Sequence, residues 1–327
     1  MKIKYKKIGV FTSGGDSPGM NAAIRAVVRT ARSYGIKVYG IRKGYEGMID
    51  NDMEELHSKD VGGIIQRGGT ILNSDRSKRF RTLEGRQTAF NNLRNRDIEA
   101  IIAIGGDGTF TGASIFHDEF KMSVIGIPGT IDNDIYGSDF TIGYDTALNT
   151  VVQAIDKIQD TAGSHNRLFF VEVMGRDAGF IALNAGIATG AEDILIPETI
   201  TYLDDLILNL KENKRRGKTS AIIIVAEGDD AGGAYEVAAK VKKLDNSYST
   251  RVSVLGHIQR GGSPSAMDRV LASSLGYEAV TGLIKGYENH MVGIMNNKTV
   301  YTPLEQAIKT PHNIDKQKLQ IARMLAI

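Results

Sequence analysis

Residues 101–110, IIAIGGDGTF, and residues 123–134, SVIGIPGTIDND, decide the fold of this chain. Each stretch begins with an apolar run typical of a buried strand and ends in a loop of glycines and carboxylates. If the two strands are parallel neighbours, both loops lie at one edge of the sheet, where open α/β sheets bind ligands. Glycines let backbone amides approach phosphate oxygens, and carboxylates can hold Mg²⁺ or accept a proton. The stretch therefore predicts a site for phosphoryl transfer.

The start of the chain has a similar pattern. Residues 8–11 are an apolar run that ends in TSGGD, and Ser17-Pro18 opens a helix whose apolar residues repeat at helical spacing until Gly35. A strand, a glycine-rich turn and a helix present amides to an anion, although such turns also occur for steric reasons alone. The arginines of this helix form either a solvated face or an anion site.

Strands and helices alternate along the rest of the chain. We predict strands at residues 38–41, 168–171, 221–226 and 252–256, a strand leading into a loop at 64–70, and a basic loop at 74–81. Helices are predicted at 83–94, 145–162 and 267–284, and the last of these closes the regular part of the chain. This alternation indicates an α/β fold whose parallel sheets carry helices on both faces.

Composition excludes several classes of protein. The 327 residues suffice for two domains, and a net charge of +2 without a polybasic tail does not favour nucleic acid or anionic lipid as a partner. The absence of cysteine excludes disulfides, thiolate metal sites and a cysteine nucleophile. The apolar run near the N-terminus is too short for a signal peptide, and no stretch approaches the roughly 18 apolar residues of a membrane span.

Five predicted strands end in glycine and charged residues: GGDGT, PGTIDND, VMGR, AEGD and LGHIQRGG. Such ends predict a polar rim along the carboxyl edges of the sheets. Its arginines and histidine suit a sugar phosphate, while its acids and glycines suit Mg²⁺ and a polyphosphate. Phosphoryl transfer needs positioning and charge neutralisation more than covalent chemistry. The sequence has no Walker A motif, GxSxG elbow or HxxxH zinc pair.

The motifs PGTIDND (128–134), GHIQRGGSP (256–264), TSGGDSPGMNAAIR (12–25) and VEVMGR (171–176) strongly resemble those of ATP-dependent 6-phosphofructokinases of the short bacterial type. IGGDG alone also resembles NAD kinases and lipid kinases, but PGTIDND and HIQRGGSP are highly specific. The resemblance covers essentially the whole chain. It implies a cytoplasmic, allosteric, homotetrameric kinase of glycolysis that phosphorylates the 1-hydroxyl of fructose 6-phosphate with Mg²⁺ and ATP.

The same resemblance implies two closely packed three-layer α/β domains with mostly parallel sheets and the active site in the cleft between them. An ATP- and Mg-binding domain would comprise residues 1–142 plus 258–308. A sugar-phosphate domain would comprise residues 143–257 plus 309–327.

Residue roles follow from the resemblance at matching positions. Asp132 would be the general base, helped by Thr130 and Asp134, with Arg76 near the transferred phosphoryl group. The ATP-binding residues would be Gly15, Arg76, Ser77, Gly106, Asp107, Gly108 and Thr109, and Asp107 would also hold the metal. The substrate residues would be Thr130, Ile131, Asp132, Arg167, Met174, Gly175, Arg176, Glu227, Arg251, His257, Ile258, Gln259 and Arg260. Arg176 is also expected to act in catalysis, and Arg167 and Arg251 would come from a neighbouring subunit.

The phosphoryl donor can be argued from the size of two residues. Pyrophosphate-dependent enzymes of the same fold have sequences like GGDD and PKTIDND. An aspartate at position 108 would crowd and repel an α-phosphate, and a lysine at position 129 would occupy space near it. Because this chain has Gly108 and Gly129, ATP is the expected donor and pyrophosphate is the alternative.

The resemblance to the family is weaker at the effector site for ADP or phosphoenolpyruvate. Arg25, Arg29, Glu192 and Lys218 agree with the family pattern at this site. Ser58 and Gln159, however, stand where arginines are often found. Losing charge-assisted hydrogen bonds of roughly 1.5–3 kcal/mol each should weaken a phosphate effector. We therefore expect reduced or altered control by phosphoenolpyruvate.

Other interpretations of these residues were weighed. Asp132 could cap a helix, His257 could be a buried imidazole, and Glu227 could be an ordinary acid at a strand end. An NAD or lipid kinase would leave PGTIDND and HIQRGGSP unexplained. A catalytically inactive nucleotide-binding subunit would have no need to keep Asp107, Asp132 and Arg176.

Overall fold

The computed structural model describes residues 4–165, 167–218 and 220–326, and within it the chain divides into two compact units. Unit 1 comprises Met1–Ile131, Ile135–Thr146 and Arg260–His312. Unit 2 comprises Asp132–Asp134, Ala147–Gln259 and Asn313–Ile327. The outer ends of the predicted domains, residues 1–3 and 327, lie outside the described residues. Among the described residues, no helix combines the length and the hydropathy needed to cross a membrane.

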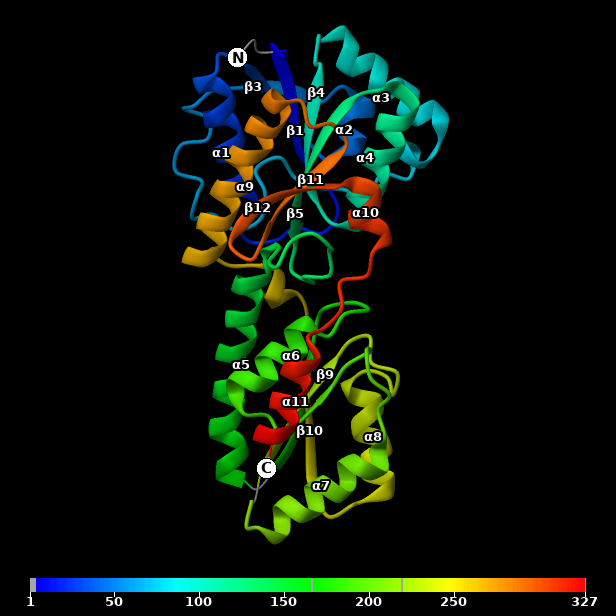
Figure 1. The fold of residues 1–327 in the computed structure, drawn as a ribbon. Coiled ribbons are helices and arrows are strands. Elements are labelled where there is room, and N and C mark those ends of the chain that lie inside the picture. Colours follow the sequence, from blue (N-terminus) through cyan, green and yellow to red (C-terminus); the bar gives the residue numbers. More distant parts are fainter. Residues whose placement is uncertain (1–3, 166, 219, 327) are drawn as a thin grey trace. The chain divides into compact units, whose positions relative to one another are not determined.

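Unit 1 is built on a mostly parallel sheet (Figure 1). Within the described residues its strand order is β12-β11-β5-β4-β1-β2-β3, with β6 paired to β5, and the β2–β3 and β11–β12 pairs are antiparallel. Its strands are β1 (Lys7–Thr12), β2 (Lys37–Ile41), β3 (Met53–Leu56), β4 (Ala100–Gly105), β5 (Ser123–Thr130), β6 (Ile142–Gly143), β11 (His290–Met295) and β12 (Lys298–Pro303). Its helices are α1 (Met20–Ser33), α2 (Tyr45–Asp50), α3 (Leu83–Asn95), α4 (Asp107–Phe120), α9 (Ala266–Lys285), α10 (Leu304–Lys309) and the 3₁₀ turn Arg79–Arg81.

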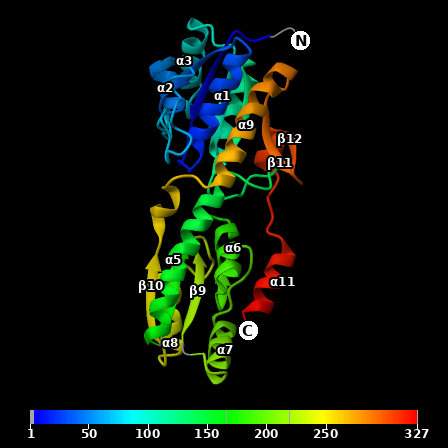
Figure 2. The same cartoon turned by 90° about the vertical axis from the view of Figure 1, so that its left-hand side faces the viewer.

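Helices cover both faces of this sheet because its central strands are apolar on both sides. On one face α1 and α9 lie side by side (Figures 1 and 2) and pack residues such as Ile24 and Leu275 against Ile102. On the other face α2, α3, α4 and α10 enclose a second core that contains Phe110 and Phe116. The central strands therefore read as continuous apolar runs, as expected for a buried parallel sheet.

Unit 2 has a smaller sheet that is parallel throughout its described strands, in the order β10-β7-β9-β8. Its strands are β7 (Arg167–Val173), β8 (Asp193–Leu195), β9 (Ala221–Ala226) and β10 (Ser249–Val254). Its helices are α6 (Phe180–Thr189), α7 (Leu203–Arg215), α8 (Ala234–Leu244), α11 (Lys316–Leu325) and most of α5 (Tyr144–His165). Helices α7 and α8 pack against β7 and β9 through a core that includes Leu206, Val237 and Phe170.

The prediction of an α/β fold with mostly parallel sheets is confirmed. Two local predictions were wrong. Residues 64–70 are turns and irregular chain, although Ile64 is buried in the core of unit 1. Regular structure also continues beyond residue 284, because β11, β12, α10 and α11 follow α9.

Candidate active site

The loops after β1, β4 and β5 meet at one edge of the sheet of unit 1. The three strands are parallel neighbours, with Thr12 opposite Ile104 and Gly105 opposite Pro128. Their carboxyl ends carry TSGGD, GGDGT and the start of PGTIDND. The pairing expected from the two apolar runs is thus the pairing observed, and β1 brings a third glycine-rich loop beside them.

The first two of these loops are packed closely together. The Thr109 hydroxyl donates to the carbonyl oxygen of Ser13 at 3.1 Å. A Cβ atom at Gly105 would lie 2.6 Å from that same oxygen, so only glycine fits there. Thr109 is 4% exposed, so its hydroxyl holds the two loops together and is not presented to a ligand.

Helix α4 starts directly at this edge. Gly106 precedes it, and Asp107 and Gly108 form its first turn. The N-terminus of a helix attracts anions through its amide groups and its dipole. Gly108 is exposed, and a Cβ atom there would meet nothing within 4 Å. The first turn of α4 is therefore open to a bulky anion.

The loop at residues 74–77 borders the same edge. The Ser74 hydroxyl donates to the Gly14 carbonyl at 2.6 Å, which joins this loop to the loop after β1. Arg76 is exposed, as expected for a residue that reaches a ligand. The Ser77 hydroxyl instead donates to Glu46 and accepts from the amide of Phe80 at 3.1 Å. The structure thus leaves Arg76 accessible and gives Ser77 a structural contact.

Arg260 also lies beside the loop after β1. A Cβ atom at Gly15 would be 2.6 Å from Nη1 of Arg260, and that nitrogen donates to the carbonyl of Asp16 at 3.4 Å. A larger residue at position 15 would displace the guanidinium. Two other candidates are buried: Thr130 accepts a 2.6 Å bond from the Thr141 hydroxyl at its carbonyl, and Ile131 is fully buried.

In unit 2, three candidate residues form one chain of contacts. Asp132 is 1% exposed, and its Oδ2 lies 3.4 Å from Nε of Arg176. The amide of Arg176 donates to Oε1 of Glu227 at 2.9 Å. Glu227 directly follows β9, and its own amide donates to the carbonyl of Val173 at the end of β7. Glu227 therefore fixes the backbone of the arginine that neutralises Asp132.

The backbone around Arg176 requires glycine at two places. Arg176 has a φ of 53° and Gly175 a φ of 146°, so both lie in the region that disfavours side chains. A Cβ atom at Gly228 would be 2.1 Å from the carbonyl oxygen of Arg176. The sequences VMGR and AEGD thus shape the same turn from two neighbouring strands.

The segment after β10 is tied to the end of β7. The side chain of Gln259, which is fully buried, accepts from the amide of Met174 at 3.2 Å and donates to the carbonyl of Gly256 at 3.0 Å. His257 and Ile258 between them are exposed. Gln259 therefore positions this loop, while His257 is left accessible at the edge where Glu227 and Arg176 also lie.

Arg167 and Arg251 do not join this group within one chain. Arg167 is the first residue of β7, whereas Met174 follows its last residue. Seven residues separate these positions, which corresponds to roughly 23 Å along a strand. Arg251 lies in the middle of β10, opposite Phe169. Arg167 therefore lies at the amino end of its strand, far from the edge that carries Arg176, and Arg251 lies partway along its own strand.

The predicted effector residues lie in both units. Arg25 is half-buried and Arg29 is exposed on α1 in unit 1. In unit 2, Glu192 accepts from the amide of Ile222 at 2.6 Å and lies 3.9 Å from Nζ of Lys218. Burial raises the pKa of Glu192.

The two departures from the family's effector pattern also have defined places. Ser58 is exposed in a turn. Gln159 donates its side-chain amide to the carbonyl of Thr189 at 2.6 Å. Its side chain is therefore bound to the protein backbone, as a structural residue would be.

Three supporting residues were not found from the sequence. Tyr45 is buried and donates to the Thr109 carbonyl at 2.5 Å, and Glu46 accepts from Ser77. Asp268 is fully buried and accepts from the amides of Gly143 and Thr146, each at 2.8 Å. The sequence shows only that Ser265, three residues earlier, can cap α9, and its hydroxyl does accept from the amide of Asp268.

Together these features are those of a phosphoryl-transfer enzyme of the α/β class, with glycine-rich loops at one edge of the sheet in unit 1 and an arginine–carboxylate group in unit 2. The family model described as Phosphofructokinase matches residues 7–283, and the chain belongs to the phosphofructokinase family. This confirms the resemblance predicted from the motifs.

Individual relatives agree with this family. The chain is 52% identical to ATP-dependent 6-phosphofructokinase 2 of Bacteroides thetaiotaomicron over 98% of its own length and 99% of that protein. It is 53% identical to ATP-dependent 6-phosphofructokinase 1 of Thermus thermophilus over 98% and 100%. Among solved structures, phosphofructokinase from Saccharomyces cerevisiae matches with a TM-score of 0.89 and 39% identity, over 93% of this chain and 45% of that one.

Proposed function

We propose that this chain transfers the γ-phosphoryl group of ATP to the 1-hydroxyl of fructose 6-phosphate, giving fructose 1,6-bisphosphate and ADP. Its relatives that match over nearly the whole length are ATP-dependent 6-phosphofructokinases. The structural observation that carries the proposal is the contact chain of Asp132, Arg176 and Glu227 in unit 2. It pairs the carboxylate of Asp132 with the guanidinium of Arg176, whose backbone is held by Glu227 at the ends of the neighbouring strands β7 and β9.

The donor side of the reaction lies in unit 1. The loops after β1 and β4 and the first turn of α4 hold the phosphates of ATP through backbone amides at Gly15, Gly106 and Gly108. Arg76 contacts the transferred group, as its exposure allows. Thr109 and Ser77 act through the loops that their hydroxyls hold in place.

Mg²⁺ fits this edge as a metal shared with the phosphates. Mg²⁺ in kinases is held by one or two carboxylates together with substrate oxygens and water. Asp107, half-exposed in the first turn of α4, supplies one such carboxylate. No group of three or more acidic or histidine side chains suited to a metal occurs among the described residues. When bound, the metal would neutralise charge on the phosphates.

Asp132 accepts the proton of the sugar 1-hydroxyl as that oxygen attacks the phosphoryl group. Arg176, 3.4 Å away, orients this carboxylate and balances negative charge near the reacting atoms. Thr130 and Asp134, on either side of Asp132 in the sequence, position the reacting groups. Most of the rate enhancement then comes from placing two bound substrates in line.

In unit 2 the sugar phosphate is held by Met174, Gly175, Glu227 and His257. Arg167 and Arg251 contribute from a neighbouring subunit of a homotetramer. Their distance along the strands from the edge that carries Arg176 supports this assignment, because a single chain does not bring them there. The site is therefore complete only in the assembly.

The remaining assignments follow from the same proposal. The residues 1–142 plus 258–308 form the ATP domain, and 143–257 plus 309–327 form the sugar-phosphate domain of a cytoplasmic enzyme. Control by ADP or phosphoenolpyruvate acts through Arg25, Arg29, Glu192 and Lys218. Control by phosphoenolpyruvate is reduced or altered because Ser58 and Gln159 stand where the family often has arginines, and Gln159 is bound to the backbone of Thr189. Strong sigmoidal inhibition by low phosphoenolpyruvate would contradict this part.

The test is a coupled assay for fructose 1,6-bisphosphate with wild-type protein, Asp132→Asn and Asp177→Asn. Asp177 is an exposed carboxylate next to Arg176 and serves as the matched control. Loss of a general base lowers turnover about 10²–10⁴-fold, so Asp132→Asn should lose that factor while Asp177→Asn stays within a few-fold. Unchanged turnover in Asp132→Asn would refute the assignment of the base.

A further inference from the structure

A cavity in unit 2 lies apart from the residues assigned to catalysis. It has a volume of about 780 Å³, opens to solvent, and is lined by residues of α6, β8, the turn that follows β8, α7 and α11. Small-molecule sites typically have volumes of about 300–1,000 Å³ and mostly apolar walls with a few convergent polar groups. This cavity has the volume of such a site, and its walls carry both apolar and polar side chains.

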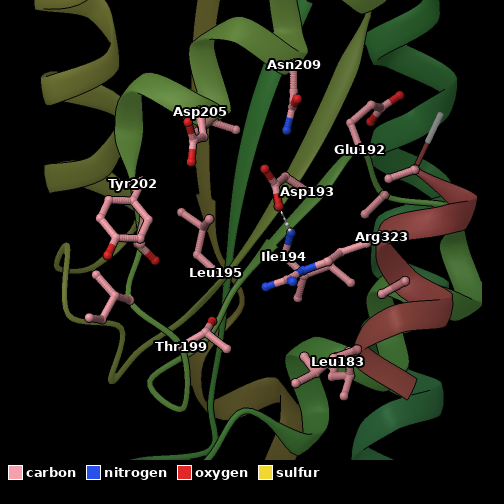
Figure 3. A pocket seen from close by; sticks show the side chains of 17 residues that line it. Leu183, Glu192, Asp193, Ile194, Leu195, Thr199, Tyr202, Asp205, Asn209 and Arg323 are labelled. Atoms are coloured by element: carbon pink, nitrogen blue, oxygen red, sulfur yellow. Dashed lines mark hydrogen bonds between the residues drawn. The ribbon is translucent and has the colours of Figure 1, made fainter. Parts of the chain in front are cut away.

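The apolar part of the cavity comes from three different elements. Leu183 of α6, Leu195 of β8 and Leu319 of α11 line it. Figure 3 shows Leu183 below the charged groups and Leu195 beside them. These side chains provide a surface for a hydrocarbon group of moderate size.

Charges of both signs line the same cavity. Asp193 of β8 and Asp205 of α7 supply carboxylates, and Arg323 of α11 supplies a guanidinium. Figure 3 shows Asp193 and Arg323 near the centre of the view, with Asp205 above them. Glu192 also lines the cavity, but its carboxylate is engaged by the amide of Ile222 and by Lys218.

Asp193 and Arg323 attract each other without forming an ion pair. Burial raises the pKa of Asp193, while a hydrogen bond from the amide of Ile194 to Oδ1, at 2.8 Å, and the charge of Arg323 oppose this rise. In the described part of the chain, no ion pair of 4.0 Å or less is formed by either residue. Two opposite charges held apart beside an apolar wall leave room for a ligand that carries the complementary charges in the same order.

We propose that this cavity binds a zwitterionic amino acid with a large apolar side chain. The ammonium group lies at Asp193 and Asp205, the carboxylate lies at Arg323, and the side chain lies against the leucines. A phosphate-bearing ligand is disfavoured because two carboxylates face the cavity, and a simple amine leaves the guanidinium without a partner. The proposal does not depend on the kinase reaction.

The test uses three probes that share one phenyl group: L-phenylalanine, phenethylamine without a carboxylate, and 3-phenylpropionate without an ammonium group. Binding to the full-length protein is measured by calorimetry and by the shift of the melting temperature, without ATP or fructose 6-phosphate. L-Phenylalanine should bind about tenfold or more tightly than either of the other probes, since each lacks one charge-assisted contact. Equal affinity for L-phenylalanine and phenethylamine, or no binding at millimolar concentration, would overturn the proposal.

Two variants and one control variant test whether L-phenylalanine binds in this cavity. Asp205→Asn should weaken binding of L-phenylalanine about tenfold, and Asp204→Asn should leave it unchanged. Both aspartates are exposed in the first turn of α7, but only Asp205 lines the cavity. Arg323→Gln should weaken L-phenylalanine and not phenethylamine. Equal effects of Asp204→Asn and Asp205→Asn, or displacement of L-phenylalanine by ADP, would assign the binding to another place.

Discussion

The substitution Gly108→Asp should lower the activity with ATP without lowering the stability of the fold. Gly108 is the second residue of α4, it is exposed, and a Cβ atom there would meet nothing within 4 Å. Aspartate has a slightly better helix propensity than glycine, and a carboxylate in the first turn of a helix contributes about 0.3–1 kcal/mol. The free energy of unfolding should therefore stay the same or rise slightly.

The effect on ATP should be large. An added carboxylate about 5 Å from a phosphate charge, at an effective dielectric constant of about 20, costs roughly 3 kcal/mol. This corresponds to a loss of about a hundredfold or more in kcat/KM for ATP. Pyrophosphate lacks the α-phosphate and nucleoside that the new side chain would crowd. The rate with pyrophosphate should therefore fall far less or rise.

The assay measures fructose 1,6-bisphosphate formation with either donor, together with the melting temperature. Gly108→Ala adds volume with almost no polarity, and Gly108→Asn adds the shape of aspartate without its charge. We expect activity in the order wild type, Ala, Asn, Asp with ATP as donor. An equal loss with both donors, or a loss in Asn as large as in Asp, would refute the electrostatic reasoning. The alternative mutation Gly129→Lys is less clean, because a Cβ atom there already lies 3.1 Å from Ile104.

Three further predictions concern the supports of the site. Glu227→Ala should raise the KM for fructose 6-phosphate and lower kcat, because the backbone amide of Arg176 loses its partner. Steady-state kinetics measure both constants. Glu227→Gln keeps an acceptor for that amide, so its constants should lie between those of Glu227→Ala and wild type. Gly228→Ala should lower kcat/KM about tenfold or more, because its Cβ atom would lie 2.1 Å from the carbonyl of Arg176. Gly163→Ala, with open space around it, is the control, and equal activity of these two variants would contradict the steric argument. Burial raises the pKa of Asp268 above its ordinary value of 3.8, so between these two pKa values the native state binds more protons than the unfolded state. The free energy of unfolding should accordingly fall as pH rises through this window, and urea titrations should show a flatter pH dependence in Asp268→Asn.

Much of the sheet of unit 1 was predictable because its signals are local. The apolar runs that became β4 and β5 end at glycine-rich loops and follow each other along the chain, which predicted a parallel pair, whereas the position of β1 beside β4 is known only from the structure. The wrong prediction of a strand leading into a loop at residues 64–70 also has a local cause. Ile64 belongs to the hydrophobic core. An apolar residue that a turn buries gives the same sequence pattern as an apolar residue in a buried strand.

The antiparallel pair β11–β12 and helix α11 were missed for the opposite reason. β11 and β12 are buried over only part of their length, and α11 has no buried residue. A segment that packs only one side against the protein carries a short and diluted pattern. Its assignment depends on what it lies against.

The sequence by itself determined the α/β class and the family and proposed the residues of the site, because these depend on local patterns and on specific motifs. Only the tertiary structure decided which of the proposed side chains are accessible and which are engaged by the protein. Thr109 and Ser77 turn their hydroxyls to the protein, Gln259 is buried, and Arg167 lies at the opposite end of its strand from Arg176. Such facts depend on contacts between residues distant in the chain, and no local pattern records which partner a hydroxyl or a guanidinium will find.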